Sequence, residues 1–327
     1  MRYYLKRCGY QELGSIKDGK AQRGRYLLTS MQTLDFFPPL STTQLNDKTI
    51  LPIIPLFTGK KLYCSFVYHN DKYHGSTAKN KRNEYRLYLN RQLDNNEHPF
   101  ETDDIVIIRN GEISENNETQ QVFFLDLIKD TGSILYNQLN TIINSSPIKG
   151  GYGVIEDDTL QEFERKVDAL SNNLEISDTI DDSVTNQLIT SDLRTIDNIF
   201  NSSSMFRDFV MASYNYRCAI TGMVIRYETL FNLEAAHIKP RSHNGSFMPN
   251  NGIALCRDMH WAFDKGFFTL TNDYIIKVHP QITSDWLFSY NGKNIQLPKE
   301  QFYRPLPENI KYHNDNVFGL FLKTGRL

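Results

Sequence analysis

The first 130 residues contain five short apolar runs separated by polar turns, and this pattern limits the fold more than any other feature of the sequence. The runs lie at 50–57, 62–69, 85–91, 104–110 and 120–128. Runs of this kind, roughly 10–20 residues apart with turn residues between them, are typical of strands in a compact barrel or sandwich. We therefore expect residues 1–150 to form a mostly β domain. Asn110-Gly111 and the polar stretch after it predict a hairpin that includes run 120–128.

The pattern changes after residue 150. Segment 159–172 has apolar residues at helical spacing, namely Leu160, Phe163, Val167 and Leu170. Because the surrounding residues are acidic and poor in aromatics, we interpret 151–203 as an acidic helical connector. A surface helix of one larger domain explains the same pattern equally well.

A third pattern begins near residue 204. Phe206, Phe209 and Val210 have helical spacing, and the segments that follow predict alternating short strands, loops and helices up to residue 327. Residues 267–280 predict a hairpin that turns at Thr271–Asp273. We expect an α+β protein with an N-terminal β-pseudobarrel and a separate domain at 204–327.

The composition excludes several classes of protein. The chain has 327 residues, of which 40% are hydrophobic and 23% charged, as in ordinary globular proteins. There is no run of eighteen apolar residues, as a membrane-spanning helix requires, and the N-terminus lacks the apolar stretch of a signal peptide. The four cysteines (Cys8, Cys64, Cys218 and Cys256) show no framework spacing, so we expect free thiols and a cytoplasmic protein.

The net charge of −2 conceals an uneven distribution. Residues 1–110 carry 17 basic and 11 acidic side chains, residues 111–200 carry 5 and 17, and residues 201–327 carry 14 and 10. Two basic ends thus flank an acidic middle, and the small total does not argue against a partner that is itself acidic.

Residues 234–266, EAAHIKPRSHNG followed by NNGIALCRDMHWAFDKG after a short gap, contain the strongest functional signal. His260 and Asp264 are four residues apart in a predicted helix that ends at Gly266, so both side chains project from one face. Such a pair can hold one divalent cation and leave open positions for water and a phosphate oxygen. A neutral His237 across from the pair can take a proton from the attacking water.

These residues resemble the HNH, or ββα-metal, endonucleases, over about 205–280 and in the tail up to the C-terminus. The resemblance implies that His237 is the general base, that Asn251 braces its loop, and that His260 and Asp264 are the metal ligands. It implies a one-metal hydrolysis of the phosphodiester bond. Each residue taken singly also has an ordinary structural interpretation, as a core or surface histidine, a helix-end aspartate or a turn asparagine.

The sequence departs from the family pattern at two points. Many relatives have a further ligand just before the general base, where this chain has Ala236, so two ligands remain, with Glu234 as a further candidate helper. This thin ligand set favours Mg²⁺, which keeps several waters, or another divalent cation such as Mn²⁺. Many relatives also have paired cysteines that bind zinc. Here Cys218 and Cys256 stand singly, so we expect no structural zinc.

Two basic segments of the N-terminal part, 17–26 and 72–86, interleave lysine and arginine with tyrosine and amide side chains. Such loops can reach base edges in double-stranded DNA, where arginine reads guanine and amides read adenine. Solvated loops of a barrel are the alternative. The predicted DNA contacts are Arg23, Arg25, Lys79, Lys81, Arg82 and Arg86 here, with Lys239 and Arg241 as phosphate contacts beside His237.

The N-terminal part also resembles the effector domain of EcoRII-type restriction enzymes, a pseudobarrel similar to the plant B-three domain. This resemblance implies a site-specific type II restriction endonuclease, with a homodimer and a cognate DNA methyltransferase as further expectations. A modification-dependent restriction nuclease and a DNA-binding protein with an inactive HNH unit are the alternatives.

Overall fold

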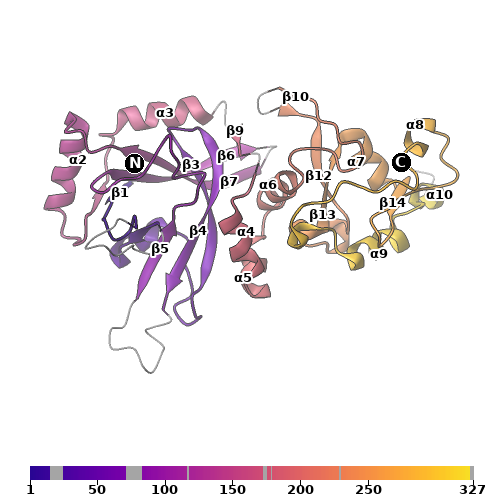
Figure 1. Ribbon diagram of the computed structural model, residues 1–327, viewed down its shortest axis with the longest axis horizontal. Helices are drawn as coiled ribbons and strands as arrows, with labels where there is room; N and C mark the ends of the chain where they lie inside the picture. Colours follow the sequence, from indigo (N-terminus) through magenta and orange to yellow (C-terminus); the bar gives the residue numbers. More distant parts are fainter. Residues whose placement is uncertain are drawn as a thin grey trace. The chain divides into compact units, whose positions relative to one another are not determined.

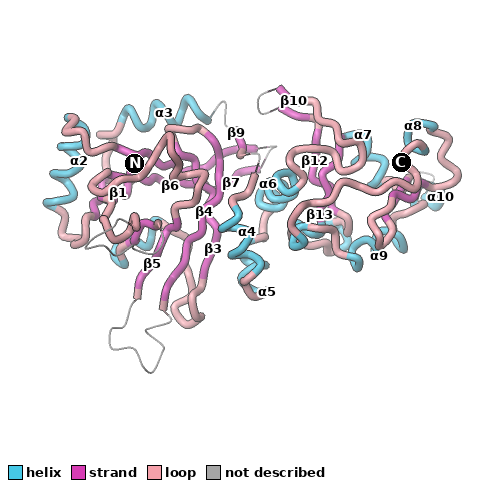
Figure 2. Tube along the Cα trace, in the orientation of Figure 1, coloured by secondary structure: helices cyan, strands magenta, loops and turns pink. Residues whose placement is uncertain are grey.

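The chain folds into two compact units. The computed structural model describes residues 1–14, 25–70, 83–115, 118–171, 175–177, 179–227 and 230–324. The first unit comprises Met1–Ser177 and Asp181–Thr195, and the second comprises Asp178–Ile180 and Ile196–Leu327. Figure 2 shows that strands dominate the first unit, whereas helices and loops surround short strands in the second. None of the helices in the described ranges has the length and apolar character that a membrane span requires.

The first unit is built on a nine-stranded, strongly curled sheet (Figure 1). Along the main path the strands follow the order β2-β5-β4-β3-β7-β6-β1-β8, and β9 pairs with β4. Neighbouring strands are antiparallel except for β3 beside β7 and β4 beside β9. The strands are β1 (Tyr3–Arg7), β2 (Tyr26–Thr29), β3 (Lys48–Pro55), β4 (Lys60–His69), β5 (Glu84–Tyr88), β6 (Ile105–Glu115), β7 (Glu118–Ile128), β8 (Tyr152–Ile155) and β9 (Glu175–Ile176).

Alternating side chains divide the apolar residues of this sheet between two cores. In β1, Tyr4 packs in one core with Phe37 and Phe66, while its neighbours Tyr3 and Leu5 pack in the other. This is the period of two that a strand with both faces buried requires. The second core is completed by two helices, α2 (Ile134–Ser145) and α3 (Gln161–Ser171), which cover the outer face.

The acidic middle of the chain belongs mostly to this first unit, and the structure differs here from the predicted domain bounds. Strand β8 pairs with β1, and Phe163 and Val167 of α3 are buried against the sheet. Helix α4 (Asp182–Ile189) adds the fully buried Val184 and Leu188. Apolar side chains at helical spacing therefore anchor the segment, and most of its described acidic residues are exposed. Helix α5 (Leu193–Ile199) contributes residues to both units.

The second unit contains a strand–strand–helix arrangement supported by further helices. Strands β12 (Leu233–His237) and β13 (Gly252–Cys256) pair antiparallel and lead directly into α7 (Arg257–Asp264). Around them lie α6 (Ser203–Ser213), the hairpins β10 (Arg226–Tyr227) with β11 (Leu230–Phe231) and β14 (Phe268–Leu270) with β15 (Ile276–Val278), and the helices α8 (Asp285–Phe288), α9 (Pro307–Asn316) and α10 (Leu320–Thr324). The α+β class and the predicted hairpin at 267–280 are confirmed.

A buried histidine of α9 holds α7 in place from behind. The His313 ring stacks on Phe263 with centroids 3.8 Å apart, and its Nδ1 is 2.8 Å from the hydroxyl of Thr269. Burial lowers the pKa of His313 to about 4, so the ring is neutral at physiological pH. Helix α7 ends at Asp264 with Lys265 as its C-cap, and Gly266 follows with a φ of +73°, the left-handed conformation that ends many helices.

Candidate active site

The paired strands β12 and β13 place His237 beside the start of the second strand. His237 is the register partner of Gly252, and Asn251 immediately precedes that glycine. The loop between the strands leaves β12 after His237 and contains two short 3-10 turns, Arg241–His243 and Pro249–Asn251. The loop therefore begins at the predicted general base and ends at the predicted brace.

Asn251 is fully buried and holds this loop through both ends of its amide group. Its Oδ1 accepts from the backbone N–H of Lys239 at 2.9 Å, and its Nδ2 donates to the carbonyl oxygens of Lys239 at 3.1 Å and Ser246 at 3.0 Å. Its own carbonyl accepts from Ile238 at 2.8 Å. Because these bonds fix the backbone directly after His237, the side chain of Asn251 is positioned for the bracing role that the sequence predicts.

The imidazole of His237 lies in an apolar, positively charged environment. Its ring stacks on Phe206 of α6, with centroids 3.9 Å apart and planes inclined by 13°, and Phe247 contacts it edge-on. Within the described residues, its buried Nε2 has no hydrogen-bond partner. Burial, reinforced by the charge of Arg241, lowers the pKa of His237 to about 4. The ring is therefore neutral near pH 7, as a proton acceptor must be.

His260 lies between two carboxylates. Its Nδ1 is 2.7 Å from Oε2 of Glu234 on β12, and its Nε2 is 3.4 Å from Oδ2 of Asp264, one turn later on α7. A neutral imidazole has one N–H and one lone pair, so it can donate to only one of these two acceptors. With the proton on Nδ1, the lone pair of Nε2 faces the carboxylate of Asp264, whose side chain is 54% exposed. Both groups would then be available to a divalent cation.

The residues present fit a divalent cation with two protein ligands. Donor atoms 3.4 Å apart can both reach one ion at the usual ligand distance of about 2.0–2.2 Å. No cluster of three or more histidine, cysteine, aspartate or glutamate side chains in the described part of the chain could serve as a larger cage. Water and phosphate oxygens would therefore fill most positions around the ion.

Two cationic side chains lie in the loop that follows His237. The guanidinium of Arg241 lies 3.9 Å from the centroid of Phe247 and donates to the carbonyl of Gly245. The ammonium of Lys239 lies 4.9 Å from the Tyr312 ring. The aromatic contacts orient both cations and consume few of their hydrogen-bond donors, which leaves donors for phosphate oxygens.

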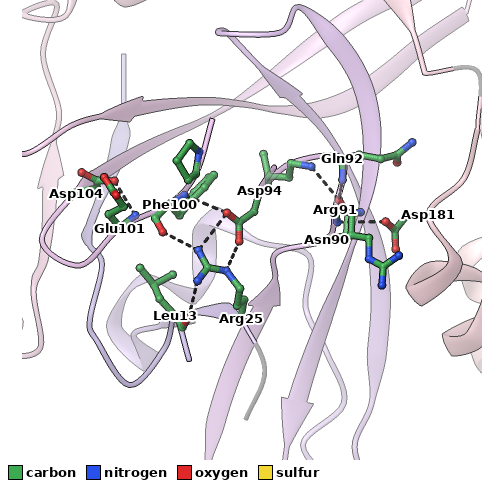
Figure 3. Close-up of polar contacts among 12 residues, drawn as sticks. Leu13, Arg25, Asn90, Arg91, Gln92, Asp94, Phe100, Glu101, Asp104 and Asp181 are labelled. Carbon is green, nitrogen blue, oxygen red and sulfur yellow. Dashed lines mark hydrogen bonds and ion pairs between the residues drawn. The ribbon is translucent and has the colours of Figure 1, made fainter. Parts of the chain in front are cut away.

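The predicted DNA contacts of the first unit have different environments. Figure 3 shows Arg25 enclosed by acceptors: both carboxylate oxygens of Asp94 and the carbonyls of Leu13 and Phe100, the latter two at 2.6 Å. This network gives Arg25 a structural role within the fold, while its side chain is 41% exposed, and Arg25 stays a predicted DNA contact. Four of the other predicted contacts, Arg23, Lys79, Lys81 and Arg82, lie outside the described residues.

Arg86 lines a cavity of about 960 Å³ in the first unit. Its guanidinium lies 4.1 Å from the centroid of Tyr26 and pairs with Glu84, which also lines the cavity. Arg7 and Gln11 contribute further polar groups. Arg86 thus remains a predicted DNA contact, and its guanidinium is paired with the carboxylate of Glu84.

The order and geometry of these residues agree with a family comparison. Residues 218–271 match the family model described as HNH endonuclease. The chain carries an HNH nuclease segment. The segment includes His237, Asn251, His260 and Asp264, and the nuclease class predicted from the sequence is confirmed. HNH nucleases generally depend on a divalent metal ion.

Two solved structures are distantly similar to the chain. The B3 domain of the UbaLAI restriction endonuclease, solved with cognate DNA, has 13% identity and a TM-score of 0.32, covering 47% of this chain and 85% of that one. The modification-dependent TagI restriction endonuclease has 14% identity and a TM-score of 0.28, covering 78% of this chain and 62% of that one. No curated protein sequence matches the chain significantly.

The sequence does not indicate the contacts of two side chains around the HNH residues. It predicts Phe206 only as part of an apolar helix face, and Glu234 only as a candidate helper. The helical period of 204–214 places Phe206 on a buried face but carries no information about its stacking partner. Because side chains alternate along β12, Glu234 and Ala236 lie on one face of the strand. This alternation could have indicated that Glu234 supplies the polar contact that Ala236 cannot make.

Proposed function

We propose that this chain is a site-specific DNA endonuclease of a restriction system, in which the HNH unit cuts and the first unit recognises the site. The observation that carries the proposal is the neutral, desolvated His237, stacked on Phe206 and followed by a loop that Asn251 holds, in the same HNH segment as the His260–Asp264 pair.

The proposed reaction is hydrolysis of a phosphodiester bond. His237 takes a proton from the attacking water, since its low pKa keeps it neutral. Asn251 fixes the backbone that carries His237, and Lys239 and Arg241 hold phosphate oxygens of the cut strand. His260 and Asp264 would hold a divalent cation, Mg²⁺ or another such as Mn²⁺, which supplies Lewis-acid stabilisation of the charge that develops on the phosphate.

Double-stranded DNA is the proposed partner of both units. The 17 basic side chains of residues 1–110, among them Arg23, Lys79, Lys81, Arg82 and Arg86, support recognition by the first unit. Cleavage of both strands of a palindromic site favours a homodimer, and a cognate DNA methyltransferase would protect the host genome. Dependence on modified bases is the rival within this class, and sequencing the ends of fragments cut from modified and unmodified genomic DNA separates the two.

A DNA-binding protein with an inactive HNH unit is the second candidate, and Ala236 favours it, because the site has only two protein ligands. Incubation with plasmid DNA and Mg²⁺ separates the candidates: nicked or linear product supports the nuclease, whereas retardation in a gel without cleavage supports the binder.

The direct test is replacement of the general base. We expect His237→Ala to lower the single-turnover cleavage rate by about 10²–10⁴-fold, because proton transfer to a positioned base contributes about this much, with DNA affinity nearly unchanged. His279→Gln, a histidine of the same unit that packs on Phe318 and Phe321, is the control. If His237→Ala cleaves DNA as fast as the wild type, the assignment is wrong.

A further inference from the structure

Glu234 connects the first strand of the ββα arrangement to its helix. One carboxylate oxygen of Glu234 lies 2.7 Å from Nδ1 of His260, and the other lies 3.4 Å from Nε of Arg257, the first residue of α7. The side chain is 43% exposed and lies three residues before His237 on β12. Glu234 is therefore tied to the face of α7 that carries the proposed metal ligands.

The contact with Glu234 determines which nitrogen of His260 carries the proton. An ionised carboxylate can only accept a hydrogen bond, so the 2.7 Å contact places the proton on Nδ1. The lone pair then lies on Nε2, the nitrogen that faces Asp264 at 3.4 Å. This is the form of the imidazole in which Nε2 can bind a cation.

The other tautomer would disable the pair. With the proton on Nε2, His260 would donate to Asp264 along the helix, an ordinary contact between residues four apart. Nε2 of His260 and the facing carboxylate oxygen of Asp264 would then be hydrogen-bonded to each other, and Nε2 would have no lone pair for a cation. Glu234 favours the ligand-ready tautomer because it offers Nδ1–H a shorter contact than Asp264 offers Nε2–H, 2.7 Å against 3.4 Å.

We propose that Glu234 is a positioning residue of the metal site, which acts through the Nδ1–H tautomer of His260 and keeps Nε2 free for a divalent cation. The proposal rests on the function proposed above. It also explains how the site can function with Ala236, which cannot bind a metal ion. Glu234, two residues earlier on the same face of β12, contacts the ligand His260 instead of the ion itself.

The test uses the full chain and Mn²⁺ alone, in two measurements. The ¹⁵N shifts of His260 in the metal-free protein report the tautomer, and the electron paramagnetic resonance signal of free Mn²⁺ reports affinity. Glu234→Ala removes the acceptor, whereas Glu234→Gln keeps an uncharged acceptor oxygen. Asp258→Asn is the matched control, since it removes an exposed carboxylate from the first turn of the same helix.

We expect Glu234→Ala to shift His260 toward the Nε2–H tautomer and to weaken Mn²⁺ binding by about 10–100-fold, the usual effect of losing a partner of a metal-bound histidine. Glu234→Gln should keep the Nδ1–H tautomer and lose less affinity, and Asp258→Asn should match the wild type. An unchanged tautomer in Glu234→Ala, or equal losses in the alanine and glutamine variants, would overturn the proposal. A wild-type chain that neither binds Mn²⁺ nor cuts DNA would overturn the proposed function itself, and this proposal with it.

Discussion

The imidazole of His237 lies flat against Phe206, and this contact determines whether the ring can act as a base. The stacked ring excludes water from one face of the imidazole, and desolvation is the largest cause of its lowered pKa. A base with a pKa of about 4 is ready at every pH above that value but is a weaker proton acceptor than an ordinary histidine. The surroundings of His237 therefore keep the imidazole unprotonated over a wide pH range but lower its affinity for a proton.

Replacing Phe206 should change the pH dependence of cleavage. Phe206→Leu admits water to one face of His237, so the pKa rises from about 4 toward its ordinary 6.5. Because His237 must be unprotonated to act, the acidic limb of kcat/KM should move upward by about one pH unit in the variant. Cleavage rates from pH 3.5 to 8 measure the shift.

The control for this prediction is Phe321→Leu, which removes an aromatic ring that packs on Phe267 and His279 in the same unit. Its acidic limb should coincide with that of the wild type. A Phe206→Leu profile that differs from the wild type in height but not in pH would show that Phe206 does not set the pKa of His237.

At the residue scale, spacing predicted the four HNH side chains but not their neighbours. His260 and Asp264 lie one turn apart, and His237 ends a strand, so local periodicity brings them within reach of one site. The contacts of Phe206 and Glu234 depend on packing between elements that are separated in sequence. Arg25 shows the opposite limit, because none of its neighbours along the chain indicates that its guanidinium pairs with the side chain of Asp94.

At the scale of elements, the close approach of α6 to β13 depends on Gly252. A Cβ at this position would lie 2.3 Å from Cγ2 of Val210 and 2.8 Å from the nearest ring atom of Phe206. Both contacts are far below van der Waals separation, so helix and strand would have to move apart. Gly252 thus allows α6 to pack directly under His237, its register partner.

We expect Gly252→Ala to lower the free energy of unfolding by about 1–3 kcal/mol, the usual effect of overpacking a core. Urea denaturation of the full chain, followed by a probe in the second unit, measures the change. The matched control is the double variant with Val210→Ala, which removes the nearest clashing atom. The two substitutions should be less than additive, since they share one contact. Simple additivity would contradict the packing explanation.

The strands of the first unit were predictable as elements, but their pairing was not. Apolar runs predicted β3 to β7, because each buries side chains on a short extended segment. The pairing of β1 with β8 joins residues about 150 positions apart, and no local pattern encodes it. For the same reason the local pattern of residues 151–203 predicts a connector rather than a part of the first unit. Asn110 and Gly111 lie inside β6 opposite Phe123 and Val122, and the two strands stay paired as far as Glu115 and Glu118.

At the scale of the whole molecule, the segregation of charge is more informative than its sum. Residues 111–200, which carry 17 acidic side chains against 5 basic ones, belong mostly to the first unit, as does the basic strand residue Arg86. Lys166 pairs with the buried Asp126, and Arg109 pairs with Glu164 of α3. These ion pairs neutralise part of the acidic charge within the first unit. The prediction of DNA binding therefore rests on the lysines and arginines of segment 72–86.

Removing this basic segment should weaken DNA binding and reduce its salt dependence. Each phosphate contact adds about 0.9 to the slope of log affinity against log salt for duplex DNA. In a His237→Ala background, which permits binding without cleavage, Lys79→Ala/Lys81→Ala/Arg82→Ala should reduce this slope by about 2–3. Fluorescence anisotropy with a labelled duplex, measured between 50 and 200 mM KCl, gives the slope. Lys149→Ala/Arg165→Ala removes two exposed cations of the same unit outside the predicted segments and should leave the slope unchanged. If both variants change the slope equally per charge removed, DNA responds to the overall charge of the unit and segment 72–86 is not its contact surface.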